Sequence, residues 1–317
     1  MRAYALRRIA LIFPTLLILT MLVFLTVRLI PGDIIDAFEL SIEDTTDLDR
    51  EAIEAMLGLD EPIYVQYAKW MGDLFQGSLG NSMWGDVSSI ERRILEKIPV
   101  TVELGVMAIG VGLLLAIPIG VYSAMRQDTA ADYGGRTLAI VGMATPNFWL
   151  GMMVMLYPAI WWGWSPPLEY IPITEAPVYN IRMLIIPSVI LGTAMAAGTM
   201  RLTRTMMLES LRQDYVRTAW SKGLTERVIV SRHVLKNALI PVITAIGMEL
   251  PMLIGGSVIV ESIFNLPGLG RYALDALTDR DYPVIAGVNL VFAVAVVMSN
   301  LVIDLIYPFL DPRVRYN

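Results

Sequence analysis

Six long apolar segments constrain this chain more than any other feature of its sequence. A helix rises about 1.5 Å per residue, so roughly twenty apolar residues cross the hydrocarbon core of a bilayer, which is about 30 Å thick. The segments that reach this length are 9–30, 100–124, 137–162, 183–200, 239–260 and 284–308. The sequence therefore predicts an all-α integral membrane protein with six transmembrane helices.

Composition agrees with a membrane protein and argues against an ordinary soluble domain. Of the 317 residues, 56% are hydrophobic and 17% are charged, and the mean hydropathy is +0.59. Such values are unusual for soluble domains. The first apolar segment follows Arg7 and Arg8, as a signal peptide would, but it exceeds the roughly 7–15 residues of a signal core and lacks a small-residue cleavage site. We therefore expect residues 1–30 to form a retained membrane helix.

The distribution of lysine and arginine predicts the orientation of the spans. With the amino terminus inside, fifteen basic residues fall on inner segments and three fall in short outer loops. The outer residues are Arg182, Arg271 and Arg280. The inner residues are Arg2, Arg7, Arg8, Arg126, Arg136, Arg313, Arg315 and the eight basic residues of segment 201–241. Because positive charge favours the cytoplasmic side, both termini are predicted to be cytoplasmic.

Residues 31–97 form an acidic segment between the first two spans. From Pro31 to Pro99, fifteen acidic residues stand against five basic ones, which gives a net charge of −10. Helical patterning over 50–59 and 63–74 predicts short helices, but the hydrophobic content is too low for an independent core. We expect an external cap of short helices that lies against the outer ends of the spans, with an acidic face that keeps it soluble.

Two spans carry features that predict how they pack. The second has a small residue at every fourth position, which lets another helix backbone approach closely. These residues are Ala108, Gly112, Ala116, Gly120 and Ala124. The third has Pro146 and Asn147 near its middle. Because proline leaves a backbone carbonyl without its helical partner, protein or water must cover this point of the third span.

Segment 201–241 is basic and lies between the fourth and fifth apolar segments. Its apolar residues Leu208, Leu211, Tyr215 and Ala219 recur at spacings of three or four, which predicts an amphipathic helix pair interrupted at Gly223. The basic residues, which stand against three acidic ones, are Arg201, Arg204, Arg212, Arg217, Lys222, Arg227, Arg232 and Lys236. From charge and periodicity alone, a solvated cytoplasmic connector is an equally good interpretation.

The order of residues in this segment resembles the coupling loop of binding-protein-dependent ABC importer permeases, and most closely the dipeptide, oligopeptide and nickel branch. The matching stretches are Asp214-Tyr215-Val216-Arg217-Thr218-Ala219, Lys222-Gly223-Leu224, His233 and Asn237-Ala238-Leu239-Ile240-Pro241. The general pattern of that family is Glu-Ala-Ala, three residues, Gly, nine residues and Ile-x-Leu-Pro. This chain departs from it at Arg217-Thr218, at His233 and at Lys236, which replaces the proline. The first two departures are usual within the peptide branch.

The resemblance implies a type I ABC importer permease fold, also called MetI-like, over residues 98–317, with a cytoplasmic coupling loop at 201–238. The residues implied to contact ATP-hydrolysing subunits are Asp214, Tyr215, Arg217, Thr218, Ala219, Lys222, Gly223, Leu224, His233 and Asn237. The implied partners are a homologous second permease subunit, two ATP-binding subunits that hold ATP and magnesium, an extracytoplasmic solute-binding protein and membrane lipid. The implied location is the cell inner or plasma membrane. The implied cargo is a dipeptide or oligopeptide, with a nickel chelate, glutathione or an oligosaccharide as alternatives.

A second motif that resembles the same family follows the fifth apolar segment. It is the turn-rich stretch from Glu261 to Gly270, and the implied residues of an external gate or loop are Glu261, Phe264, Pro267, Gly268 and Gly270. In the peptide branch, the segment after the first span faces the solute-binding protein, which is the role the resemblance implies for 31–97.

Glu249 is the acidic residue that lies nearest the middle of a predicted span. It falls ten residues after Leu239 and eleven before Val260, where an ionised carboxylate costs about 2.5–3.5 kcal/mol. One interpretation is a protonated glutamate that bonds Asn147 or Asn300 on a neighbouring span. The other is that Glu249 lines the translocation path with Asn147 and offers charge to a cationic group such as the amino terminus of a peptide.

Several function classes lack their characteristic residues in this sequence. There is no G-x-x-x-x-G-K-[ST] phosphate loop, so we expect no ATP site in this chain. One histidine and no cysteine make a metal site implausible, and we expect His233 to pack or hydrogen-bond within its loop. No grouping suggests an enzyme or a nucleic-acid surface. A secondary transporter is a remote alternative, because Glu249 alone could couple an ion and no inverted repeat is visible.

Overall fold

The computed structural model describes residues 2–29, 60–83, 89–167 and 169–310. The helices in these ranges are α1 (Arg2–Arg28), α4 (Ile63–Phe75), α5 (Ile90–Met125), α6 (Ala130–Ala144), α7 (Asn147–Trp162), α8 (Pro177–Leu211), α9 (Asp214–Ser221), α10 (Glu226–Val228), a π-helical stretch η1 (Ile229–Val234), α11 (Leu235–Ile263), α12 (Leu269–Asp279) and α13 (Tyr282–Leu310). The helix predicted over 50–59 lies outside the described residues.

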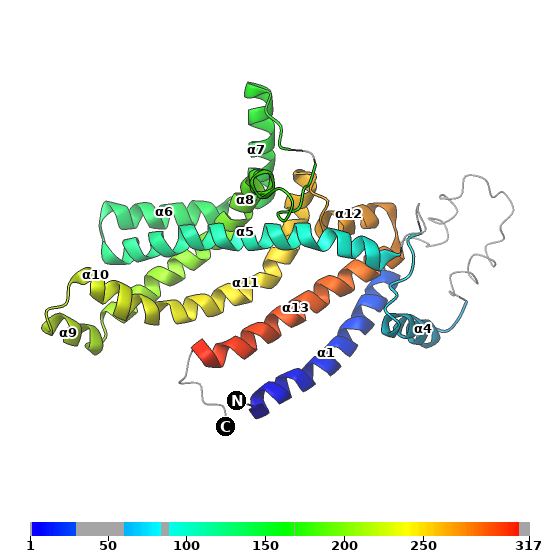
Figure 1. Ribbon diagram of the computed structural model, residues 1–317, viewed down its shortest axis with the longest axis horizontal. Helices are drawn as coiled ribbons and strands as arrows, with labels where there is room; N and C mark the ends of the chain where they lie inside the picture. The colour runs from blue at the N-terminus through cyan, green and yellow to red at the C-terminus, as the bar shows by residue number, and fades with distance from the viewer. Residues whose placement is uncertain (1, 30–59, 84–88, 168, 311–317) are drawn as a thin grey trace.

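Five helices within the described residues are long and apolar enough to cross a membrane, and the bent pair α6 and α7 supplies a sixth crossing if it is counted as one span. This confirms the all-helical membrane architecture. Figure 1 shows that α1 begins and α13 ends toward the same end of the bundle as α9 and α10, as expected if both termini are cytoplasmic. Helices α5 and α8 extend beyond the apolar segments predicted over 100–124 and 183–200, because α5 begins at Ile90 and α8 runs from Pro177 to Leu211.

The small-residue stripe of α5 packs directly against the backbone of α8. A Cβ atom at Gly192 would lie 2.6 Å from the carbonyl oxygen of Ala108, and one at Gly120 would lie 2.8 Å from the carbonyl oxygen of Met200. Ala108 and Ala116 are completely buried. Close backbone approach of this kind is the reason for small residues at helix contacts in membranes. The predicted packing role of the stripe is therefore confirmed, and α8 is identified as its partner.

The third predicted span, 137–162, is not a continuous helix. Helix α6 ends at Ala144, α7 begins at Asn147, and the two axes differ by 91°. Pro146 has no N–H to donate to the Gly142 carbonyl, and its ring holds Thr145 in an extended conformation, with φ −88° and ψ 116°. Figure 1 shows α7 turning away from the neighbouring helices α5 and α6. The proline therefore ends the helix instead of only bending it.

Helix α4, which matches the helix predicted over 63–74, packs on the end of α1. The ring of Phe24 lies 5.3 Å from that of Tyr67 and 5.7 Å from that of Trp70, between centroids. The guanidinium group of Arg28 lies 3.7 Å from the Phe24 centroid. These aromatic contacts attach the described part of the acidic segment to the first span, as the predicted cap requires.

Candidate functional site

Helix α9 is held to the end of the bundle by its apolar side. Val216 is 1% exposed and Ala219 is 6% exposed. They pack in a cluster with Ala124 of α5, Met207 of α8 and buried residues of the returning chain, which are Ile229, Val234 and Ala238. The amphipathic character predicted for this part of the segment is thus present. The second half of the predicted pair is different, because α10, η1 and α11 follow one another without a break from Glu226.

The opposite side of α9 is open, and we call it the α9 face. Arg217 and Asp214 are highly exposed and form a surface ion pair with 3.4 Å between nitrogen and oxygen. Two large aromatic side chains accompany them: Tyr215 is 40% exposed and Trp220 is 50% exposed. Exposed aromatic and arginine side chains on one short helix are the residue types that dominate protein interfaces.

The ten predicted coupling residues do not all lie on this surface. Seven are exposed, namely Asp214, Tyr215, Arg217, Thr218, Lys222, Gly223 and Asn237. Leu224 and His233 are partly buried, and Ala219 is buried. The Asn237 amide donates to the His233 carbonyl oxygen at 3.0 Å. Ala219 therefore anchors α9 to its own bundle, and Trp220, which the sequence reasoning did not select, is exposed beside it.

Gly223 follows the end of α9 and is itself in the left-handed conformation, with φ +74°. The Gly223 N–H donates to the Trp220 carbonyl at 2.9 Å, and the Leu224 N–H donates to the Ala219 carbonyl at 3.4 Å. This pair of bonds is a Schellman motif, which favours glycine because a left-handed residue with a Cβ atom is strained. A Cβ atom at Gly223 would meet nothing within 4 Å. The position thus needs glycine for its backbone angle and not for space.

The stretch around Glu261 forms a joint between helices at the end of the bundle opposite α9. Glu261 is fully buried; it accepts a hydrogen bond from the Thr101 hydroxyl at 2.8 Å and another from the Arg271 N–H at 3.0 Å. The Thr101 hydroxyl also accepts the Leu269 N–H at 2.9 Å. Side chains from α5 and α11 therefore cap the first turn of α12.

The glycines of this motif are explained by the same joint. A Cβ atom at Gly268 would overlap the Glu261 carboxylate, and one at Gly270 would lie 2.6 Å from the Cα atom of Val258. Phe264 is buried and Pro267 is partly buried. The structure brings Glu261, Gly268 and Gly270 together as a structural contact. Their predicted role in an external gate stays a prediction.

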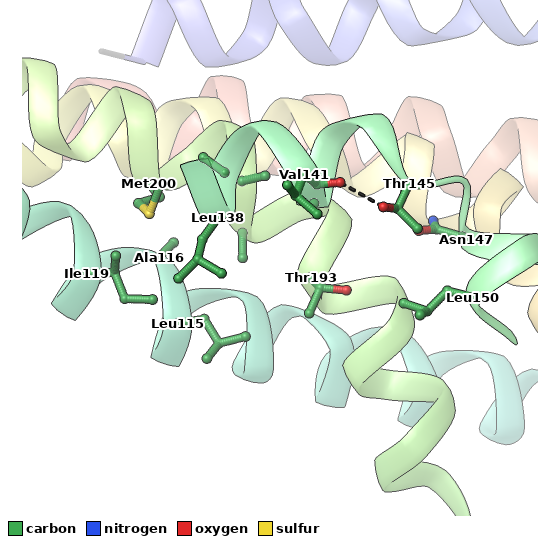
Figure 2. Close-up of a pocket in the computed structure, with 14 residues that line it drawn as sticks. Leu115, Ala116, Ile119, Leu138, Val141, Thr145, Asn147, Leu150, Thr193 and Met200 are labelled. Atoms are coloured by element: carbon green, nitrogen blue, oxygen red, sulfur yellow. Dashed lines mark hydrogen bonds between the residues drawn. The ribbon is translucent and has the colours of Figure 1, made fainter. Parts of the chain in front are cut away.

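A cavity of about 370 Å³ lies beside the break between α6 and α7. Its walls come from α5, α6, α8 and the start of α7 and are almost entirely apolar (Figure 2). The polar side chains among its lining are Thr145, Asn147 and Thr193. The Thr145 hydroxyl donates to the Val141 carbonyl at 2.8 Å, and the same carbonyl also accepts the Thr145 N–H at 3.0 Å. Asn147, predicted to line the path, therefore does face a cavity.

Glu249 lies outside this cavity and has fewer contacts than predicted. Its Oε1 atom lies 3.7 Å from the position that a Cβ atom would take at Gly198 of α8. Its Oε2 atom is buried and has no hydrogen-bond partner within the described residues. No hydrogen bond to Asn147 or Asn300 is formed within the described residues, and both interpretations of Glu249 stay predictions.

The sequence reasoning missed a fully buried carboxylate, Asp132, in the first turn of α6. Its Oδ1 lies 2.7 Å from Arg204 Nε, and its Oδ2 lies 2.8 Å from Arg204 Nη2. Arg136 Nη2 lies 2.9 Å from Oδ2. The Asp128 N–H donates to Oδ2 at 3.1 Å, and the Ser123 hydroxyl also donates to the carboxylate. The available signal was an aspartate four residues before an arginine at the start of an apolar helix.

The chain matches two family descriptions that together cover most of its length. Residues 116–316 match the binding-protein-dependent transport system inner membrane component, and residues 1–105 match the N-terminal part of such a membrane component. The chain is 40% identical to the oligopeptide transport system permease protein AppB of Bacillus subtilis, and 37% identical to the dipeptide transport system permease protein DppB of Alkalihalophilus pseudofirmus. Each comparison covers 100% of both chains.

A solved structure shares the fold at much lower sequence identity. It is the crystal structure of an amino acid ABC transporter with histidines, with a TM-score of 0.54 and 15% identity over 69% of this chain and 94% of the other. This likeness agrees with the permease fold expected for residues 98–317. Because the family descriptions and the full-length relatives agree, the chain belongs to the family of binding-protein-dependent transport system inner membrane components.

Proposed function

We propose that this chain is a membrane-spanning permease subunit of an ATP-driven importer whose cargo is a peptide delivered by an extracytoplasmic binding protein. The observation that carries the proposal is the α9 face. Val216 and Ala219 fix α9 to the bundle, while Tyr215, Arg217 and Trp220 remain open at its end. A helix that is anchored on one side and open on the other suits docking to a separate protein.

The proposed occupant of the α9 face is an ATP-hydrolysing subunit, with one such subunit on each of two homologous permease chains. Tryptophan, tyrosine and arginine are the side chains that most often dominate binding energy at protein interfaces. The chain contains no phosphate-binding loop of its own, so ATP and magnesium would be held by those partners. This chain would contribute no catalytic residue.

Transport would follow from a change of shape that ATP drives in its own subunits. ATP binds one arrangement of the complex better than the other, and the difference in binding free energy shifts the equilibrium between inward-open and outward-open forms. The α9 face is the surface through which the ATP-hydrolysing subunits would transmit their change of shape to this chain. The cavity beside the α6–α7 break lies where the moving bundle could expose or close a path.

The names of full-length relatives support a peptide as the cargo. The Bacillus subtilis relative is an oligopeptide permease, and the Alkalihalophilus relative is a dipeptide permease. Glu249 fits this class if it faces the path in the assembled complex, because its Oε2 atom has no partner in the described residues and a peptide amino terminus is a cation. A nickel chelate, glutathione or an oligosaccharide would use the same architecture.

The test is purification followed by reconstitution. A tagged copy of the chain, expressed with the other subunits of its transport system, should retain ATP-hydrolysing subunits and a second permease chain. Vesicles that contain this complex should take up a labelled peptide only when ATP is inside and the binding protein is outside. Absence of ATPase subunits from the purified complex, or uptake that does not need ATP, would refute the proposal. Uptake of another solute instead would change only the cargo.

A further inference from the structure

Asp132 connects parts of the chain that are separate in sequence. It stands in the first turn of α6, Ser123 belongs to α5, and Arg204 belongs to α8. The Asp132 side chain is 0% exposed, and that of Arg204 is 17% exposed. Both nitrogen contacts from Arg204 are shorter than 3 Å and reach different carboxylate oxygens. This two-pronged geometry fixes orientation as well as distance, unlike the apolar contacts around it.

The same part of α8 also packs against α9, the helix that presents the α9 face. Met207, one turn beyond Arg204, is completely buried against Val216 and Ala219 of α9 and against Ala124 of α5. Helix α8 runs without a break through both residues to Leu211. A force applied to α9 therefore reaches Arg204 through packed side chains and continuous helix.

Helix α6 runs from Asp132 to the break that borders the cavity. It is uninterrupted to Ala144, a distance of roughly 20 Å at about 1.5 Å per residue. Its residues Leu138, Val141 and Gly142 line the cavity, and Figure 2 shows Leu138 and Val141 on the α6 wall facing residues of α5 and α8. A shift of α6 at Asp132 would therefore move this wall and the start of α7.

We propose that Asp132 and Arg204 are positioning residues for coupling, which make α6 follow α8 so that movement of the α9 face reaches the cavity at the α6–α7 break. The inference rests on the proposed function, because it assumes that ATPase subunits act on α9. Arg136 serves a different purpose, since it bonds Asp132 within α6 itself and Asp128 in the turn before α6 at 3.7 Å, and among the described residues it bonds no second helix.

The decisive comparison uses two arginines that share one carboxylate. Arg204→Gln breaks the contact between helices, whereas the control Arg136→Gln removes the same charge and breaks contacts within α6 and to the turn before it. Each variant leaves Asp132 with one arginine. In vesicles that contain the full complex, the measured quantity is peptide transported per ATP hydrolysed. We expect Arg204→Gln to lower this ratio about tenfold with ATP hydrolysis retained, a size typical of coupling between sites, and Arg136→Gln to stay near the unsubstituted ratio.

Equal ratios for the two variants would overturn the inference. If the Arg204→Gln complex does not assemble, Arg204→Lys decides instead. Lysine keeps the charge that Asp132 needs but cannot span both carboxylate oxygens, so we expect an assembled complex with a lowered ratio. An unchanged ratio for Arg204→Lys would equally overturn the inference.

A covalent link separates positioning from simple structural support. Cβ atoms at Gly142 of α6 and Ala197 of α8 would lie 3.5 Å apart, within reach of a disulfide, and the chain has no other cysteine. We expect Gly142→Cys with Ala197→Cys, added to the Arg204 variant that assembles, to raise the ratio when oxidised relative to the same protein when reduced. No difference between the two forms would refute a role in tying α6 to α8. If no ATPase subunits copurify even with the unsubstituted chain, the proposed function fails instead.

Discussion

Gly223→Asp tests whether the α9 face is a docking surface. The substituted side chain would enter open space, because a Cβ atom at this position meets nothing within 4 Å. The cost to folding is therefore backbone strain alone, on the order of 1–2 kcal/mol for a residue with a Cβ atom in the left-handed region. Aspartate and asparagine tolerate this conformation better than most residues.

The matched control is Gly223→Asn, which has nearly the same shape and backbone preference but no charge. Both variants should reach the membrane at similar levels, since both carry the same strain. We expect Gly223→Asp to lose peptide uptake and to retain fewer ATPase subunits on purification, because it adds negative charge beside Lys222 at the end of α9. Gly223→Asn should keep more peptide uptake and more ATPase subunits than Gly223→Asp. The reasoning fails if the two variants behave alike, or if Gly223→Asp assembles and transports normally.

Three further predictions concern topology, the path and the joint around Glu261. A cysteine placed at Ser78 should react with an impermeant reagent on intact cells, and one at Ser221 should react only after permeabilisation. Labelling of the Ser221 position on intact cells would contradict the predicted orientation with cytoplasmic termini. If the Glu249 carboxylate lines the path, Glu249→Gln should lower uptake of cationic peptides while the complex still assembles with its ATPase subunits. Unchanged uptake would exclude Glu249 from the path. Gly268→Ala should lower the apparent Tm of the purified complex, since overpacking typically costs about 1–3 kcal/mol. The control Gly105→Ala should leave the Tm unchanged, because a Cβ atom there meets nothing within 4 Å. Equal Tm values for the two variants would contradict the close packing of Gly268 against Glu261.

Much of the fold could be predicted because its signals are local. The length of an apolar run is sufficient to identify a membrane helix, since backbone groups in lipid must bond within their own segment. The small residues of α5 likewise predicted close packing, although they did not identify α8 as the partner. Gly223 was recognisable because a left-handed helix end has few alternatives to glycine.

The break in the third span was only half predictable. Pro146 indicated a lost hydrogen bond, but many prolines bend a membrane helix without ending it. The 91° angle between α6 and α7 depends on what each helix packs against, and that information is not local. The same holds for Glu249, whose depth follows from counting residues but whose neighbours do not.

The sequence by itself therefore determined the membrane class, every span but the broken third one, the loop that carries α9 and the glycine that ends it, because each depends on residues within a few turns of one another. Only the tertiary structure decided which charges are buried and paired. Asp132 and Arg204 are 72 positions apart, and Thr101 and Glu261 are 160 apart. Nothing in the sequence near any of these residues identifies its partner. Their partners become defined only when α5, α6, α8 and α11 pack together, because burial is what makes a charge require a partner.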